Sequence, residues 1–301
     1  MTRPVVADDT SKPLSPSPGQ RRRRIRRRLR RIGRVRRPRV RGPSFNRLIP
    51  NILTMLGLCA GLSGIRFGLV HQFSSAAAAL LIAACIDGLD GRIARLLRGT
   101  SRFGAEFDSL SDFVCFGVAP PLLLFLWSLD NAGRYAYVPC ILFTVCMALR
   151  LARFNASLDD ADKPEYSHSF FTGVPAPAGA GMAMFPIFLG LEAERLGATR
   201  IDAFAHAPAV SVLVLVGTAL LLVSTLPVWS FKNFKVPAAY VLPVMLGTGI
   251  YAAVLVADPW GALAAAGVIY LVMLPFSRRS FHRLKIEAEA LSEDVEEDVV
   301  S

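Results

Sequence analysis

The sequence predicts an all-α protein, a polytopic transmembrane helical bundle with about eight spans. Two observations lead to this fold class. Of the 301 residues, 53% are hydrophobic, which is high for a soluble domain of this size. Apolar stretches of roughly 20 residues, each long enough to cross a hydrocarbon core as a helix, recur between short polar connections from about residue 48 to residue 276. We therefore expect the chain to be embedded in a membrane.

The distribution of charge divides the chain into three predicted parts. Residues 1–43 contain 16 of the 34 basic residues and only two acidic ones, a net charge of +14, so the remainder of the chain sums to −3. We expect residues 1–43 to be a disordered, arginine-rich cytoplasmic tail, either solvated or attracted to anionic headgroups. No nucleic-acid-binding domain is inferred from it. Residues 44–285 form the predicted transmembrane domain, and residues 286–301 an acidic, flexible tail.

The predicted spans follow the apolar runs in chain order. They are expected at residues 48–70, 74–97, 106–128, 134–155, 174–192, 207–226, 238–256 and 258–275. Alternate connections are rich in basic residues: Arg98 and Arg102, then Arg150, Arg153 and Lys163, then Lys232 and Lys235, then Arg278, Arg279, Arg283 and Lys285. By the positive-inside rule, these connections and both chain ends are expected in the cytoplasm.

Four acidic residues lie where a bilayer ordinarily excludes charge, at the end of the second span and the start of the third. Asp87 and Asp90 are three residues apart, and Asp108 and Asp112 are four apart, so each pair projects from one helix face. An ionised side chain deep in a bilayer costs at least about 2.5 kcal/mol, which bound cations would offset. Carboxylates without His or Cys suit Mg²⁺ or Mn²⁺, which complete their shells with substrate phosphates and water. The pattern predicts a metal site for a pyrophosphate substrate.

The residues around these aspartates fit that prediction. Gly91 and Gly104 remove side-chain bulk where a nucleotide or another helix approaches the backbone. Arg95 lies one turn beyond Gly91, where it can pair with a phosphate. Two alternatives remain open: the carboxylates form ion pairs with nearby arginines that hold two helices together, or they mark a cation or proton pathway of a transporter.

The run Asp87-x2-Asp90-Gly91-x2-Ala94-Arg95-x8-Gly104-x3-Asp108-x3-Asp112 resembles the complete signature of the CDP-alcohol phosphotransferase family, at all eight positions and every spacing. The resemblance implies a six-helix core and places catalysis in residues 44–285. It implies two divalent metal ions held by Asp87, Asp90, Asp108 and Asp112, with Asp112 also acting as the general base. It also implies a CDP-binding set made of Asn51, Thr54, Asp87, Gly91, Ala94, Arg95, Ser101 and Gly104.

Sequence outside the signature is most similar to the membrane-type phosphatidylserine synthases of this family. The similar segments are 49–51, 107–112, 116–120, 149–155, 171–177 and 230–232, and Val228-Trp229 departs from the pattern. This resemblance implies phosphatidyl transfer from CDP-diacylglycerol to L-serine, with CMP as the second product. Glycerol 3-phosphate, inositol phosphate and choline are alternative acceptors that would use the same metal site.

Three polar residues at the cytoplasmic end of the fourth span are candidates for a further site. Arg150, Arg153 and Asn155 are placed to hold a lipid phosphate or the serine carboxylate, although positive-inside anchoring also accounts for the arginines. The active site is accordingly expected to face the cytoplasm from the inner (cytoplasmic) cell membrane. The run Ala178-Gly179-Ala180-Gly181 would permit the close helix contacts of a homodimer.

Overall fold

The computed structural model describes residues 45–97, 101–158, 170–224, 227–229 and 238–273. The chain divides into two units, Met1–Pro43 and Ser44–Ser301, and every described residue belongs to the second unit. The predicted tails at 1–43 and 286–301 therefore lie outside the described residues.

Helices make up nearly all of the described residues, which confirms the all-α class. They are α2 (Phe45–Leu69), α3 (Phe73–Leu96), α4 (Arg102–Asp112), the π-helical segment η1 (Phe113–Val118), α5 (Ala119–Leu124), the π-helical segment η2 (Phe125–Leu129), α6 (Val138–Leu158), α7 (Ala176–Ala183), α8 (Phe185–Leu196), α9 (Thr199–Ala205), α10 (Pro208–Val223), α11 (Ala238–Ala257) and a last helix, Pro259–Met273. Among the described residues, five helices are long and apolar enough to cross a membrane, or up to seven if each bent pair is one span. The predicted eighth span corresponds to the shorter helix Pro259–Met273.

One predicted span is bent, and another begins at a bend. The span predicted at 174–192 consists of α7 and α8, which meet at 45°, and α10 is preceded by α9 at 53°. Each second helix has a proline in its first turn, Pro186 or Pro208. Proline has no N–H to donate to the preceding turn, so the helix restarts in a new direction.

The third span, Arg102–Leu129, comprises α4, η1, α5 and η2. It contains π-helical turns because two prolines lie within it. Pro120 and Pro121 cannot donate to the carbonyls of Phe116 and Gly117, the residues four positions before them. The helix widens into η1, and the hydroxyl of Thr144 in α6 donates to the Gly117 carbonyl at 2.9 Å. The widened turn begins directly after Asp112, and π-bulges are frequent at functional sites.

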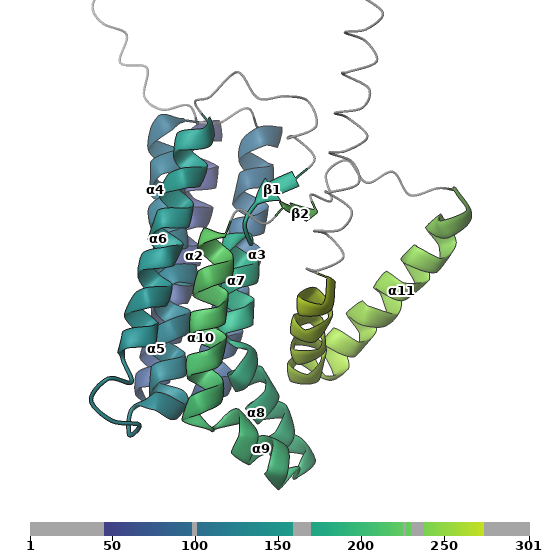
Figure 1. The fold of residues 1–301 in the computed structure, drawn as a ribbon. Coiled ribbons are helices and arrows are strands. Elements are labelled where there is room, and N and C mark those ends of the chain that lie inside the picture. The colour runs from purple at the N-terminus through teal and green to yellow at the C-terminus, as the bar shows by residue number, and fades with distance from the viewer. Residues whose placement is uncertain (1–44, 98–100, 159–169, 225–226, 230–237, 274–301) are drawn as a thin grey trace, which may run out of the picture. The chain divides into compact units, whose positions relative to one another are not determined.

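A row of glycines lets α2 approach its neighbours closely. A Cβ at Gly57 would lie 3.3 Å from Ile86 Cγ2, and one at Gly64 would lie 3.2 Å from the Ala76 carbonyl oxygen of α3. Gly61 and Gly68, on the same glycine-rich side, pack against Cys115 and Leu123 of the third span. Small residues of this kind allow membrane helices to pack backbone to backbone. As a result α2 packs against both α3 and α4, and this holds the acidic segments of α3 and α4 near each other (Figure 1).

The small-residue run in α7 serves packing within the chain. A Cβ at Gly179 would lie 2.7 Å from Leu222 Cδ2 of α10, and Ala180 is buried. These two residues therefore line an internal helix contact, and the homodimer stays a prediction.

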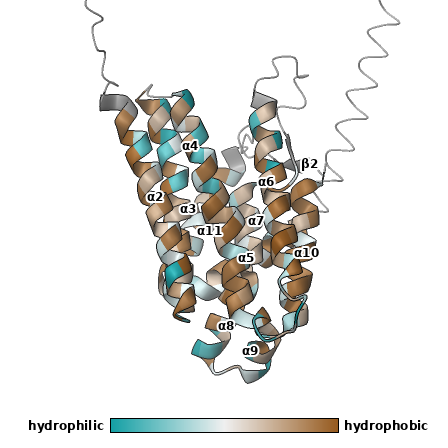
Figure 2. Cartoon of the chain, turned by 90° about the vertical axis from the view of Figure 1, so that its left-hand side faces the viewer, coloured by the Kyte–Doolittle hydropathy of each residue, from teal (hydrophilic) through white to brown (hydrophobic). Residues whose placement is uncertain are grey.

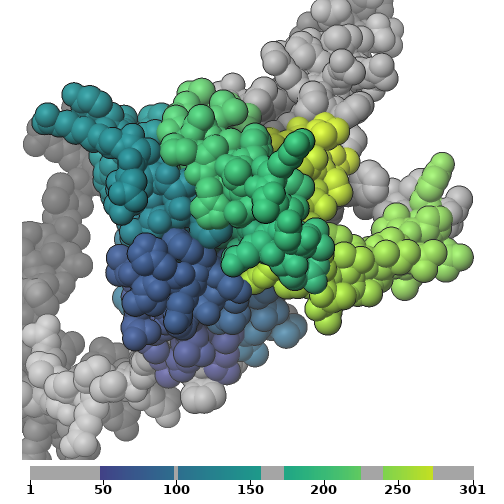
Figure 3. Space-filling view, turned by 90° about the horizontal axis from the view of Figure 1, so that it is seen from below, coloured from purple at the N-terminus to yellow at the C-terminus, as the bar shows by residue number. Residues whose placement is uncertain are grey.

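The core lies between α3, the third span, α6, α7, α8 and α10, where Leu123, Phe143, Met147, Ile187 and Leu215 are fully buried. Hydrophobic residues dominate the outside of α10, while hydrophilic residues gather at the upper ends of α4 and α6 (Figure 2). None of the span Tyr240–Ala257 in α11 is buried within the chain (Figure 3). This distribution is that of helices whose outer surfaces face lipid.

Two contacts join the last helix to α8. Arg195 Nη2 lies 2.8 Å from Asp258 Oδ2, and the rings of Phe188 and Trp260 stack with centroids 6.3 Å apart. The hydrogen-bonding contact with Glu192, the hydrogen bond from the Gly261 amide and the charge of Arg195 lower the pKa of the partly exposed Asp258 carboxyl below its usual value. Asp258 is therefore charged at neutral pH and remains paired with Arg195.

A short β-ribbon is an unpredicted feature. Strand β1 (Phe170–Thr172) pairs antiparallel with β2 (Pro227–Trp229), with Phe170 opposite Trp229. Val228-Trp229, which departs from the pattern of the phosphatidylserine synthases, thus lies in a strand. Gly173 follows β1 with φ +84, and a Cβ there would lie 2.9 Å from the carbonyl oxygens of Leu222 and Ser224. The turn into α7 therefore requires glycine, because both the backbone angle and the space exclude a side chain.

Candidate active site

Three of the predicted metal ligands meet at the ends of α3 and α4. One carboxylate oxygen from each of Asp87, Asp90 and Asp108 lies within 4.8 Å of the other two. No arginine, lysine or histidine forms a salt bridge with these carboxylates among the residues that the structure describes. Hard oxygen ligands gathered without an internal counter-charge form a site suited to a divalent metal ion. The same observation weighs against the alternative of ion-paired carboxylates.

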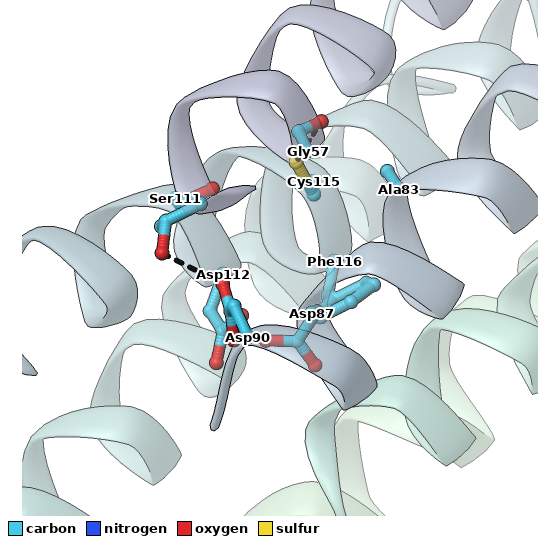
Figure 4. A pocket seen from close by; sticks show the side chains of 9 residues that line it. Gly57, Ala83, Asp87, Asp90, Ser111, Asp112, Cys115 and Phe116 are labelled. Atoms are coloured by element: carbon cyan, nitrogen blue, oxygen red, sulfur yellow. Dashed lines mark hydrogen bonds between the residues drawn. The ribbon is translucent and has the colours of Figure 1, made fainter. Parts of the chain in front are cut away.

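The fourth predicted aspartate completes the group. Asp112 is the last residue of α4, and its carboxyl group faces that of Asp87 within hydrogen-bonding reach. Figure 4 shows the side chains of Asp87, Asp90 and Asp112 converging from two helices. Asp112 is thus beside the metal-binding group, where it could both ligate a cation and accept a proton from a bound hydroxyl.

Thr54 of α2 holds one of these carboxylates. Its Oγ1 donates to Asp90 Oδ2 at 2.6 Å, and both side chains are buried, with 6% and 3% of their surfaces exposed. A weaker contact joins the same hydroxyl to the Pro50 carbonyl at 3.1 Å. Hydrogen bonds of this kind fix the orientation of a metal ligand. Thr54, predicted from resemblance to contact CDP, therefore also forms the wall of the metal site.

The start of α4 brings three other predicted residues together. Ser101 is the N-cap, and its hydroxyl accepts a hydrogen bond from the Gly104 amide at 3.0 Å. A Cβ at Gly104 would lie 2.8 Å from Asn51 Oδ1 and 3.1 Å from Ser101 Oγ. The absence of a side chain at Gly104 thus lets α2 and α4 place the polar groups of Asn51 and Ser101 side by side.

The predicted residues on α3 face an open region. Only Arg95 Nη1 comes within 4 Å of the position of a Cβ at Gly91, at 3.9 Å. Ala94 is half-buried and Arg95 is exposed on the following turn. This stretch of backbone is accessible to a ligand, and Arg95 has the reach to contact its phosphates.

The three residues predicted at the end of α6 have different surroundings. Asn155 Nδ2 donates to Ser109 Oγ at 2.9 Å, next to Asp108 in sequence. Arg153 Nη1 donates to the Val223 carbonyl at 3.2 Å, at the C-terminal end of α10 where carbonyls have no helical partner. Arg150 lies within electrostatic reach of Asp112. The charge of Arg150 thus acts on Asp112, while Asn155 contacts the residue that follows Asp108.

The site also contains residues that the sequence did not single out. A pocket beside the aspartates is lined by Thr54, Gly57, Ala83, Asp87, Asp90, Ser111, Asp112, Cys115 and Phe116 (Figure 4). Ser109 and Ser111 flank the acidic residues of α4, so their positions on that polar segment were the available signal. Gly57 and Ala83 are small residues in apolar runs, and no local pattern distinguishes them from packing residues.

Comparison with known proteins agrees with this geometry. Three relatives are named CDP-diacylglycerol–serine O-phosphatidyltransferase. That of Mycobacterium leprae is 38% identical over 254 residues, covering 84% of this chain and 82% of the relative. That of Mycobacterium tuberculosis is 40% identical over 237 residues, covering 77% of this chain and 79% of the relative. That of Helicobacter pylori is 34% identical over 225 residues, covering 75% of this chain and 88% of the relative. The family model for CDP-alcohol phosphatidyltransferases matches residues 47–278. The chain therefore belongs to the CDP-alcohol phosphatidyltransferase family.

Proposed function

We propose that this membrane protein transfers the phosphatidyl group of CDP-diacylglycerol to L-serine, giving phosphatidylserine and CMP. The observation that carries the proposal is the convergence of carboxylates from α3 and α4 at one pocket. A bond forms between the serine hydroxyl oxygen and the phosphorus that bears diacylglycerol. The bond from that phosphorus to the CMP oxygen breaks, and the hydroxyl proton passes to Asp112. One bond to phosphorus thus replaces another, and no covalent enzyme intermediate is formed.

In this proposal Asp87, Asp90, Asp108 and Asp112 bind two divalent cations, either Mg²⁺ or Mn²⁺. When bound, these ions supply neutralising charge to the pyrophosphate and to the CMP leaving group. Thr54 orients Asp90 through its 2.6 Å hydrogen bond. Asp112, in contact with Asp87, is positioned for the role of general base.

The CDP moiety lies, in this proposal, along Asn51, Thr54, Asp87, Gly91, Ala94, Arg95, Ser101 and Gly104. The uncovered backbone at Gly91 and the polar groups of Asn51 and Ser101 that lie beside Gly104 support this placement. Arg150, Arg153 and Asn155 remain the candidates for a lipid phosphate or serine. Of these, Arg150 has the strongest support because of its proximity to Asp112.

The proposal also covers the setting of the enzyme. We place the catalytic domain at residues 44–285, with the site facing the cytoplasm from the inner membrane. The basic connections and the polar upper ends of α4 and α6 support this orientation. A homodimer belongs to the same proposal, and α11 offers an apolar surface that the chain itself leaves uncovered. Light scattering of the detergent-solubilised protein tests the dimer.

The decisive experiment follows CMP release from CDP-diacylglycerol by the purified full chain, with Mg²⁺ or Mn²⁺ and one acceptor alcohol at a time. Serine should support release, and glycerol 3-phosphate, inositol phosphate and choline should not. Asp112→Asn should lower the rate at least about 100-fold, since general-base catalysis commonly contributes that much.

Glu106→Gln is the matched control. Glu106 is exposed on the same helix and outside the acidic cluster, so this variant should retain the wild-type rate. Equal release with every alcohol would contradict the choice of serine. An Asp112→Asn variant as active as Glu106→Gln would contradict the assigned base.

A further inference from the structure

Arg150 is a cation whose partner the described residues do not supply. It is half-buried in α6, within electrostatic reach of Asp112, and it forms no hydrogen bond or salt bridge with any described side chain. Its neighbour Arg153 has a different role, because that guanidinium binds the end of α10. A partly desolvated guanidinium favours an anionic partner. Among the described residues Arg150 thus lacks a hydrogen-bonded anionic partner, and a bound anion would provide one.

Tyr270, in the helix Pro259–Met273, presents a second unsatisfied group to the same region. Its ring packs against the hydrophobic core, while its hydroxyl is enclosed and has no hydrogen-bond partner. Packing alone would be served equally by phenylalanine. A buried hydroxyl without a partner is destabilising, so it is expected to acquire a partner at some stage of function.

These two groups lie within electrostatic reach of each other, on helices far apart in the sequence. The Tyr270 hydroxyl and the Arg150 guanidinium interact electrostatically, and Arg150 in turn interacts with Asp112. Each offers hydrogen-bond donors, and together they form a site for an anionic group beside the residue assigned as the base.

Two anions take part in the proposed reaction, and the geometry favours one of them. The diphosphate of CDP-diacylglycerol would be neutralised by the cations that the aspartates of α3 and α4 would hold. The attacking hydroxyl must lie at Asp112, and in serine the carboxylate is joined to that hydroxyl through only two carbon atoms. A group that holds the carboxylate must therefore lie close to Asp112, as Arg150 does.

We propose that Tyr270, together with Arg150, binds the carboxylate of the acceptor amino acid and selects it over alcohols without a carboxylate. This inference rests on the proposed function. It assigns a specificity-determining residue to the last helix, outside the segments that carry the catalytic signature. Arg150 contributes the charge and Tyr270 one further hydrogen bond to a carboxylate oxygen.

The test compares Tyr270→Phe with the wild-type full chain in the CMP-release assay. Phenylalanine keeps the ring and removes only the hydroxyl. The KM for L-serine should rise about 10-fold, as expected for loss of a hydrogen bond to a charged group, while the KM for CDP-diacylglycerol stays unchanged. The preference for serine over serinol, which carries a hydroxymethyl group in place of the carboxylate, should fall by the same factor. Thermal stability should be equal or higher, because an unsatisfied buried hydroxyl is removed.

Tyr251→Phe is the matched control, because Tyr251 is exposed on α11; it should leave both KM values unchanged. An unchanged serine KM in Tyr270→Phe would overturn the inference, and so would a rise confined to the KM for CDP-diacylglycerol, which would assign the site to the lipid phosphate. Wild-type protein that releases no CMP with serine would instead overturn the proposed function, which distinguishes the two failures.

Discussion

Thr54 illustrates at the scale of one residue how a membrane helix prepares a carboxylate for metal binding. Asp90 is almost fully buried, and its described hydrogen-bond donor from another helix is the Thr54 hydroxyl at 2.6 Å. Without this bond the carboxylate could rotate away from the oxygen atoms of Asp87 and Asp108. Loss of a hydrogen-bond partner of a metal ligand commonly weakens metal affinity.

Thr54→Val preserves the shape of the side chain and removes the donor. A hydrogen bond to a charged group contributes about 1.5–3 kcal/mol, so the Mg²⁺ concentration for half-maximal activity should rise by roughly 10-fold or more. Titration of CMP release with Mg²⁺ measures this concentration. Thr54→Ser retains the hydroxyl and should behave like the wild type. Identical titrations for the valine and serine variants would show that the bond does not support the metal site.

At the scale of an element, the third span shows how a neighbouring helix supplies a hydrogen bond that prolines remove. Pro120 and Pro121 leave the helix short of two N–H donors, and η1 widens between them and Asp112. Thr144 of α6 supplies the missing donor to the Gly117 carbonyl. The hydrogen bond thus stabilises the widened turn and joins the third span to α6 at the same time.

Thr144→Val should lower the free energy of unfolding by about 1–3 kcal/mol, because it leaves a buried carbonyl without its donor. Thermal unfolding of the detergent-solubilised protein would show this as a lower Tm. The control is Thr248→Val, since the Thr248 hydroxyl donates to the Val244 carbonyl on an exposed face of α11. A Tm for Thr144→Val that matches the control would refute this stabilising role.

At the scale of the whole molecule, a bound cation would join separate helices. Asp87 and Asp90 belong to α3, and Asp108 and Asp112 to α4. These carboxylates repel one another without a cation, and none forms a described salt bridge with a basic side chain. Divalent metal should therefore stabilise the fold as well as support the reaction.

Removal of metal by EDTA should lower the Tm of the full chain relative to protein in Mg²⁺. Saturation at 100 times the dissociation constant corresponds to about 2.7 kcal/mol of stabilisation. In Asp108→Asn the difference between the Mg²⁺ and EDTA values should shrink, because one ligand and one repulsive charge are lost. Glu106→Gln should keep the wild-type difference. A wild-type Tm that is insensitive to metal would argue against a cation bridge between α3 and α4.

The sequence by itself determined the class of fold and the identity of the acidic group. Both depend on local geometry: the length of an apolar run sets whether a helix spans a bilayer, and spacings of three and four place carboxylates on one helix face. The prediction that Asp87, Asp90 and Asp108 come together is accordingly matched by their oxygen atoms within 4.8 Å.

Only the tertiary structure decided features that depend on which helices pack together. The separate surroundings of Arg153 and Asn155 arise because different sides of α6 contact α10 and α4. The pairing of β1 with β2 and the isolated hydroxyl of Tyr270 likewise depend on partners distant in the chain. Such contacts follow from packing between elements, and no periodicity within one element encodes them.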